Sequence, residues 1–448
     1  MTFKSALEID CGLRYMYDSL CIMSSCGRKM LLAREMMTTE SEVDAYYSRL
    51  KNILDKNCSQ IAHKLMYLKD IHNTLSRLAD GTTLDDIELF EIKHLAILSA
   101  QIGNMLTEQD ITAVTLPQLH MVIEILDPDN LNIPSFYVYD SYSDELREVR
   151  KQMKALQGQG EDLTDDKRQE LATLLQRHAD LELEVRKHLS RQLLTYTSQL
   201  RNTLDNLASL DILIAKATQI KEMNLCLPRI EKETYTLYNN MFHPAVKAHL
   251  AEQGKDFMPV DITFDREPIT IIGANMGGKS VVLKTLALNQ LLAQYGFGVA
   301  AHDCNINLVE DISLCIGDEQ SIVKGVSSFA GEILAINTVI GKIKAGKKIL
   351  ALIDEPARTT NPIEGTALVE GLLQVIDTTH GAFILTTHYN IVNTRVKRYR
   401  VKGLINGKMD YTLEETRCGD VPHEAIAIAE SIGVDTEWIA YTKKNLNN

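Results

Sequence analysis

Apolar residues recur at intervals of three and four along most of residues 1–245, a spacing that predicts a succession of amphipathic helices. Thr39 followed by Glu42 has the form of a capping box and predicts the start of one of these helices. The turn signal Asp-Pro-Asp-Asn at residues 127–130 interrupts the pattern, so a connector is expected at residues 117–140. We therefore predict a helical domain over residues 1–245.

Two stretches of this domain space their apolar residues alternately by three and four, as in a coiled coil. The apolar positions are Leu146, Val149, Met153 and Leu156 in the first stretch and Leu171, Leu174, His178, Leu181 and Val185 in the second. A polar, glycine-containing tip at residues 158–164 separates them, and Thr164 is the expected N-cap of the second helix. These features predict an antiparallel coiled-coil arm over about residues 141–195.

Near residue 245 the pattern changes to short β-branched runs that alternate with helices and glycine-rich turns, which is typical of an α/β domain. We expect strands at residues 269–272, 348–353 and 383–386, a helix at 279–294, a β-hairpin at 401–413 and a C-terminal helix at 436–444. An α/β domain is therefore predicted over residues 246–448.

A glycine-rich segment lies between the first of these strands and the helix. It reads Gly273-Ala-Asn-Met-Gly-Gly-Lys-Ser280 and fits the phosphate-binding pattern G-x-x-x-x-G-K-[ST]. A chance glycine-rich turn also fits the pattern, but the position between strand and helix favours a phosphate loop, with Lys279 on the β- and γ-phosphates and Ser280 on Mg²⁺. The residues assigned here to nucleotide binding are Gly273, Asn275, Met276, Gly277, Gly278, Lys279, Ser280 and Val281.

Two acidic residues follow the strand expected at residues 348–353. Asp354 is predicted to hold Mg²⁺ together with the loop serine, and Glu355 to orient or deprotonate the attacking water. An acidic pair after a strand is an ordinary loop in most proteins, and only the phosphate loop upstream favours the catalytic interpretation. His388 ends the next strand and is predicted to donate a hydrogen bond to the γ-phosphate. The predicted catalytic residues are thus Glu355, Lys279 and His388.

A loop of small residues at 324–332 opens a further helix, whose start could bind an anion. The phosphates of its own chain already lie on the phosphate loop, so this helix start is expected to complete the site of a second subunit. The sequence therefore predicts a dimer with composite sites.

Together these residues resemble the MutS-type ATPases, which share the nucleotide sandwich of the ATP-binding cassettes. The likeness is carried by Asn275 to Ser280, Ala293 to Gly296, Ile316-Gly317, Ser327 to Glu332, Asp354-Glu355, Arg358, Thr387 to Tyr389 and Phe242-His243-Pro244. It implies an α-helical lever domain with the coiled-coil arm, followed by an α/β P-loop NTPase domain of the ABC/MutS type, with ATP and Mg²⁺ as cofactors. It also implies that Phe257 stacks on the adenine, that Gln294 belongs to the nucleotide site, and that Ser327 reaches the γ-phosphate of the partner subunit.

The chain departs from the family pattern in two places. Residues 357–362 read Ala-Arg-Thr-Thr-Asn-Pro where the family has Gly-Arg-Gly-Thr followed by Ser-Thr, which puts the usual coupling between the two ATP sites in doubt. The lever resemblance starts within the first thirty residues, so we expect a short form of the family without the mismatch-reading domains.

Composition narrows the function classes. A chain of 448 residues with 45% apolar residues can bury a large core, and its net charge of −13 disfavours a general nucleic-acid coat or a membrane-surface binder. The absence of a long apolar stretch or a secretion signal predicts a cytoplasmic protein without a membrane partner.

The eight cysteines form no Cys-x-x-Cys pair and have no histidine at zinc-ligand spacing, so we expect reduced core thiols and assign no metal site to them.

The expected tip of the arm carries charges of one sign. Together with the start of the second helix it runs from Gly158 to Asp166, carries Glu161, Asp162, Asp165 and Asp166 and has no basic residue, so a tip facing DNA phosphates would be repelled. A solvated acidic turn without a binding role is an equally good interpretation.

Two classes of client therefore stay open. In the first, an ATP-driven homodimer, or a heterodimer with a related subunit, opens and closes its arms around a protein client. The short form and its residues 357–362 resemble the ATPase subunit of the reactivase for an adenosylcobalamin-dependent lysine aminomutase. In the second, the protein senses mismatched, branched or damaged DNA. The first class is preferred because of the acidic tip.

Overall fold

The computed structural model describes residues 1–131, 135–157, 164–230, 235–273, 278–316, 328–376, 381–392, 396–405, 408–416, 426 and 434–446. Contacts group the chain into two compact units, each made of segments that are separate in sequence. Unit 1 contains Met1–Leu20, Ala33–Tyr47 and Lys216–Asn448, and unit 2 contains Cys21–Leu32 and Ser48–Ala215. The sequence pattern changes near residue 245. The division into two domains at that point stays a prediction.

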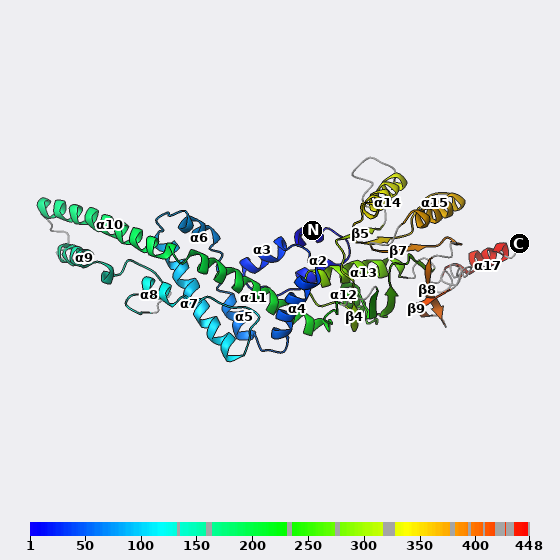
Figure 1. The fold of residues 1–448 in the computed structure, drawn as a ribbon, viewed down its shortest axis with the longest axis horizontal. Helices are drawn as coiled ribbons and strands as arrows, with labels where there is room; N and C mark the ends of the chain where they lie inside the picture. Colours follow the sequence, from blue (N-terminus) through cyan, green and yellow to red (C-terminus); the bar gives the residue numbers. More distant parts are fainter. Residues whose placement is uncertain are drawn as a thin grey trace. The chain divides into compact units, whose positions relative to one another are not determined.

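Unit 2 is helical in the residues that the structure describes (Figure 1). Its elements are α5 (Ser59–Leu65), α6 (His72–Ala79), α7 (Asp86–Glu108), α8 (His120–Leu126), the 3-10 helix η1 (Asp140–Tyr142), α9 (Asp144–Gln157) and α10 (Asp165–Leu194). Most of α3 (Ser25–Ala33), the end of α4 (Glu40–Leu54) and the first part of α11 (Thr197–Met223) also belong to it. The capping box is confirmed, because Glu42 N–H donates to Thr39 Oγ1 and Thr39 N–H donates to the Glu42 carboxylate.

The two helices predicted for the arm are present as α9 and α10 and contact each other. The apolar stripe of α9 is buried, as are Leu181 and Val185 on α10. Ion pairs link the helices, between Arg150 and Glu182 at 2.8 Å and between Arg177 and Glu145 at 2.6 Å. The tip lies outside the described residues except for Thr164, and the coiled-coil geometry stays a prediction.

Unit 1 contains two sheets. The smaller one is antiparallel, in the order β2-β1-β4, and consists of β1 (Thr236–Met241), β2 (Val260–Phe264) and β4 (Asp303–Asn305). The larger has the order β5-β6-β7-β3-β8-β9, and its strands are β5 (Asp311–Cys315), β6 (Ile349–Ile353), β7 (Ala382–Thr387), β3 (Ile269–Ile272), β8 (Lys397–Ile405) and β9 (Lys408–Glu415). Only β9 runs antiparallel to its neighbour in this sheet. The α/β interpretation is therefore confirmed as a mixed sheet.

The helices of unit 1 include those predicted from the sequence. They are α1 (Phe3–Ala6), α2 (Leu13–Asp18), α12 (Pro244–Glu252), α13 (Lys279–Gln294), α14 (Ser328–Lys344), α15 (Pro362–Val375) and α17 (Thr436–Leu446). The predicted hairpin is formed by β8 and β9, which pair from Tyr399 with Glu415 to Ile405 with Lys408. No helix among the described residues is both long enough and apolar enough to cross a membrane.

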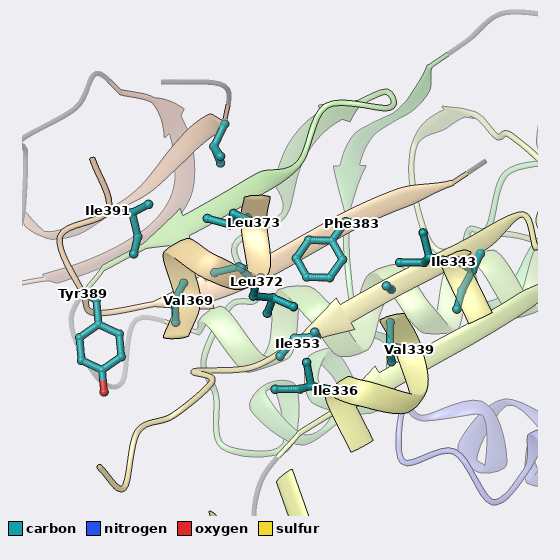
Figure 2. Close-up of a cluster of buried hydrophobic side chains, with 14 residues drawn as sticks. Ile336, Val339, Ile343, Ile353, Val369, Leu372, Leu373, Phe383, Tyr389 and Ile391 are labelled. Carbon is teal, nitrogen blue, oxygen red and sulfur yellow. The ribbon is translucent and has the colours of Figure 1, made fainter. Parts of the chain in front are cut away.

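Helices cover both faces of the larger sheet. On one face, Ile336, Val339 and Ile343 of α14 and Val369, Leu372 and Leu373 of α15 form a cluster with alternate residues of β6 and β7, such as Ile353 and Phe383 (Figure 2). The intervening residues Leu350 and Leu352 are also buried and point to the other face, because side chains alternate along a strand. Helix α13 contacts β5, β6 and β7 and covers that second face. Burial on both faces explains why β6 is apolar at every position.

Candidate active site

The phosphate-loop segment starts where β3 ends. All four residues of β3 are buried, and α13 begins at Lys279. Gly278 precedes the helix with φ of 74°, a left-handed conformation that favours glycine, and a Cβ there would lie 3.0 Å from a Tyr411 ring carbon. The strand before the glycine-rich segment and the helix after it are thus present as predicted. Asn275, Met276 and Gly277 lie outside the described residues, and their role stays a prediction.

The first two residues of α13 reach the acidic pair that follows β6. Lys279 is 4% exposed, and its Nζ donates to the Gly273 carbonyl at 2.8 Å and lies 3.1 Å from Glu355 Oε1. Ser280 Oγ donates to Asp354 Oδ2 at 2.5 Å. Motifs separated by more than seventy residues therefore meet in one group of four side chains.

Thr386, on β7, joins the two acidic residues to each other. This strand lies between β3 and β6, and its register places Leu385 opposite Ile353, just before the acidic pair. The Thr386 hydroxyl donates to Asp354 Oδ1 and accepts a hydrogen bond from the Glu355 backbone N–H at 2.9 Å. The sequence analysis gave a role only to His388, two residues further along the chain. The signal that could have identified Thr386 is its position at the end of a strand adjacent to both motifs.

The turn that carries Glu355 has an uncommon backbone. Glu355 has φ of 44° and Ala357 has φ of 61°, both in the left-handed region. Residues other than glycine occupy this region at a cost of about 1–3 kcal/mol, and such conformations concentrate at functional sites. Two side chains hold the turn, because Ala357 N–H donates to Glu332 Oε1 at 2.6 Å and Tyr389 donates its hydroxyl to the Ala357 carbonyl at 2.7 Å.

The electrostatics of this turn keep the tyrosine in its donor form. Burial raises the pKa of the Tyr389 hydroxyl, and the nearby carboxylates of Glu332 and Glu355 raise it further. The hydroxyl therefore remains protonated and available to the Ala357 carbonyl. Arg358 adds a positive charge near the site, with its Nη1 atom 3.8 Å from Glu355 Oε2.

Four further residues were predicted to belong to the nucleotide site. His388 follows β7 and is exposed, with its ring centroid 4.3 Å from that of Tyr389. Val281 is half-buried in the first turn of α13, and Phe257 is half-buried in the segment between α12 and β2. Ser327 lies outside the described residues. The roles of all four stay predictions.

Gln294 does not belong to the site. It is the last residue of α13, about 22 Å from the first at ~1.5 Å per residue. Its amide is fully buried and donates to the carbonyls of Met37 and Val309 at 2.7 Å each. The side chain is thus a structural bridge at the opposite end of the helix, and its assignment to nucleotide binding is corrected.

The donor set fits a triphosphate with Mg²⁺. A serine hydroxyl and a carboxylate are the hard oxygen ligands that Mg²⁺ prefers, and a buried lysine on a glycine-rich turn suits phosphate oxygens. Direct bonding of Ser280 to Asp354 shows that the two oxygens lie close enough to share one ion.

Residues 269–430 match the family model of MutS domain V. The match begins at β3 and includes the phosphate-loop segment, the acidic pair and Thr386, so the side chains described above lie within the matched segment. The matched residues are fewer than half of the chain.

Curated relatives agree with the domain V match. The chain is 30% identical over 250 residues to Endonuclease MutS2 of Caldanaerobacter subterraneus subsp. tengcongensis, covering 53% of this chain and 30% of the relative. It is 28% identical to Endonuclease MutS2 of Carboxydothermus hydrogenoformans, over 62% of this chain and 36% of that protein. For Endonuclease MutS2 of Streptococcus pneumoniae, the identity is 26% over 81% of this chain and 46% of the relative. The aligned region is thus less than half the length of each of these relatives.

Proposed function

We propose that the chain binds ATP with Mg²⁺ and hydrolyses it. The observation that carries the proposal is the meeting of Lys279 and Ser280 with Glu355 and Asp354, in two direct contacts of 3.1 and 2.5 Å. These contacts link a phosphate loop to an acidic pair at the carboxyl ends of parallel strands, where ligands bind in open α/β sheets. The match to MutS domain V supports the same conclusion.

Each side chain then has a role in hydrolysis. Bound Mg²⁺ would neutralise charge on the β- and γ-phosphate oxygens, with Ser280 and Asp354 as its protein ligands. Lys279 would bind the phosphates and would then no longer contact Glu355. The Glu355 carboxylate would accept a hydrogen bond, and then a proton, from the attacking water. The water oxygen forms the new bond to phosphorus while the bond between the γ-phosphorus and the ADP oxygen breaks. His388 would donate a hydrogen bond to the γ-phosphate.

The Lys279→Ala variant tests this proposal. The lysine ammonium supplies the point charge at the β- and γ-phosphates, so we expect tight ATP binding and steady-state ATP hydrolysis both to be lost. The measurements are titration with a fluorescent ATP analogue and phosphate release. Lys284→Ala is the matched control, because this lysine lies on the same helix and its Nζ bonds Asp10 instead. An ATPase rate in Lys279→Ala equal to that of the parent chain contradicts the proposal.

We further propose that the ATPase acts as a homodimer, or as a heterodimer with a related subunit, and moves helical arms around a client. The client is proposed to be a protein, such as an adenosylcobalamin-dependent aminomutase in a reactivase of the short MutS form. Two features of the sequence support a protein client, the acidic residues at the expected tip of the arm and the net charge of −13.

Structured DNA is the second candidate, favoured by the name Endonuclease MutS2 that the relatives carry. Fluorescence anisotropy with labelled duplex, mismatched and branched DNA, with and without ATP and Mg²⁺, separates the two. Binding below micromolar concentration that responds to ATP would establish the DNA-sensor function. An ATPase-active protein that leaves all three DNAs unbound would support a protein client.

A further inference from the structure

Three potential metal ligands from distant parts of the sequence meet in unit 2, whereas the residues of the proposed ATP site belong to unit 1. Cys26 lies in the first turn of α3, Asp70 lies in the segment before α6, and His72 is the first residue of α6. One ligand atom from each of these residues lies within 4.8 Å of the others. Sequence reasoning assigned no metal site to the cysteines, because the spacing between these residues follows no short motif.

A histidine bridge connects this cluster to a fourth residue. His72 Nδ1 lies 2.7 Å from Asp70 Oδ1, and His72 Nε2 lies 3.3 Å from Asp205 Oδ1 on α11. The imidazole thus presents one nitrogen to the cluster and the other to a second carboxylate. Histidines that bind metals almost always donate their remaining N–H to such a carboxylate or carbonyl group, which fixes the ring orientation.

Burial and nearby carboxylates shift the pKa values of two residues in the cluster. Burial raises the pKa of the Cys26 thiol to about 12, and the negative charge of Asp70 is the next cause. Burial lowers the pKa of His72, but hydrogen bonds from the imidazole to Asp70 and Asp205 raise it above its ordinary value overall. Binding of a divalent cation would displace the protons of the thiol and of the imidazole nitrogen that faces the ion.

We propose that Cys26 Sγ, an Asp70 carboxylate oxygen and His72 Nδ1 bind one Zn²⁺ ion, with Asp205 accepting a hydrogen bond from His72 Nε2. Tetrahedral zinc with bonds of ~2.0–2.3 Å places its ligand atoms roughly 3.3–3.8 Å apart, so on binding His72 Nδ1 and Asp70 Oδ1, now 2.7 Å apart, exchange their hydrogen bond for bonds to the ion and separate by about 0.6 Å. The fourth ligand is a water, because the His72 side chain is 50% exposed and leaves the cluster open to solvent.

The ligand types select zinc over the hard cations. Thiolate and imidazole favour Zn²⁺, whereas Mg²⁺ and Ca²⁺ are bound by oxygen ligands alone. Lys29 Nζ, which lies 2.7 Å from Asp70 Oδ2, is the competing cation, but its side chain is 74% exposed and can turn into solvent. The bound ion would join α3, the start of α6 and, through Asp205, α11, and so would stabilise the folded unit 2.

Cobalt substitution tests the site in the full chain without nucleotide. After dialysis against a chelator, Co²⁺ is expected to bind with the near-ultraviolet thiolate-to-cobalt charge-transfer band and the visible bands of tetrahedral cobalt. Stoichiometric Zn²⁺ should abolish these bands by displacement. In Cys26→Ser the charge-transfer band should disappear, and in Asp205→Asn the affinity for Zn²⁺ should fall about 10- to 100-fold, as for loss of a carboxylate behind a histidine ligand.

Cys58→Ser is the matched control, because Cys58 is a second buried thiol of unit 2 outside the cluster, and its charge-transfer band should be unchanged. Far-ultraviolet circular dichroism of each variant establishes that it is folded. His72→Asn provides a further variant should Cys26→Ser not fold. Two results overturn the proposal: no charge-transfer band in the parent chain, or a band that survives both Cys26→Ser and His72→Asn.

Discussion

Thr386 shows how a neutral residue can position two charged ones. Its hydroxyl contacts both Asp354 and the backbone of Glu355, and it lies on the strand between the two motifs. The hydroxyl therefore sets the distance between the proposed Mg²⁺ ligand and the proposed base.

Replacing Thr386 by Val removes the hydroxyl and keeps the shape of the side chain. We expect kcat to fall about fivefold while the KM for ATP changes little, because one buried hydrogen bond is worth about 1 kcal/mol and the effect falls on the position of the base. Steady-state phosphate release over a range of ATP concentrations measures both constants.

Thr270→Val is the matched control. Thr270 lies on the neighbouring strand β3, and its buried Oγ1 has no hydrogen-bond partner among the residues that the structure describes. This variant should keep its kcat, and equal losses of kcat in the two variants would contradict the role given to Thr386.

Lys216 is a buried lysine of unit 1 whose charged form is disfavoured in the folded chain. It is fully buried, and its Nζ donates to the Tyr295 carbonyl at 2.6 Å and to the Tyr46 hydroxyl at 3.0 Å. Burial lowers the pKa of this ammonium group well below its ordinary value, and the charge of Arg34 lowers it further. Above the folded-state pKa the unfolded chain binds one more proton, so stability rises with pH until the unfolded pKa of about 10.4.

The Lys216→Met variant removes this dependence. The stability of the parent chain relative to the variant should increase as the pH rises towards about 10, by at most ~1.4 kcal/mol per pH unit. Urea unfolding at several pH values measures the difference. Lys221→Met, at an exposed position of the same helix, should differ from the parent chain by an amount that does not change with pH. A difference for Lys216→Met that is constant with pH would refute the linkage.

At the scale of elements, the end of α13 depends on a single glycine. The helix closes with Phe297 N–H donating to the Leu292 carbonyl and Gly296 N–H donating to the Ala293 carbonyl, a Schellman motif. Gly296 has φ of 73°, and a Cβ there would lie 2.1 Å from a ring carbon of Tyr46. The sequence showed a helix ending at this glycine, but the packing of Tyr46 on it depends on the tertiary fold.

Gly296→Ala should destabilise unit 1 by roughly 2–5 kcal/mol, the sum of left-handed strain and displacement of a packed ring. Gly346→Ala is the control, since Gly346 also ends a helix with φ of 78° but a Cβ there would meet nothing within 4 Å. It should lose only the strain of about 1–2 kcal/mol. Thermal unfolding followed by circular dichroism compares them. A loss for Gly296→Ala no larger than that for Gly346→Ala would show that Tyr46 does not restrict this position.

At the scale of the whole molecule, the predicted dimer depends on ATP. Glu355→Gln keeps a hydrogen-bonding side chain but cannot accept a proton, so the variant should bind ATP without turnover and remain in the closed dimer. Gel filtration with light scattering in ATP and Mg²⁺ should show the dimer mass, and in ADP a return towards the monomer. A monomer in ATP and Mg²⁺ would refute the composite site proposed for Ser327. Normal turnover in this variant would remove Glu355 from its role as the base.

Features encoded within a short stretch of sequence were predictable. The strand at 269–272, the helix from Lys279 to Gln294 and the hairpin of β8 and β9 follow from local apolar spacing, glycines and turn signals, and the structure confirms them. The family resemblance placed Gln294 in the nucleotide site, whereas the structure places it at the opposite end of α13. Its partners, the carbonyls of Met37 and Val309, lie far away in the sequence.

The sequence alone determined the elements and the residue types of the proposed ATP site, because periodicity and the G-x-x-x-x-G-K-[ST] pattern are local properties of the chain. Only the tertiary structure decided which side chains touch. Strand order placed Thr386 between Asp354 and Glu355, and helix packing brought Cys26 next to His72. The physical reason is that apolar burial and strand pairing select these long-range neighbours, and neither leaves a fixed spacing in the sequence.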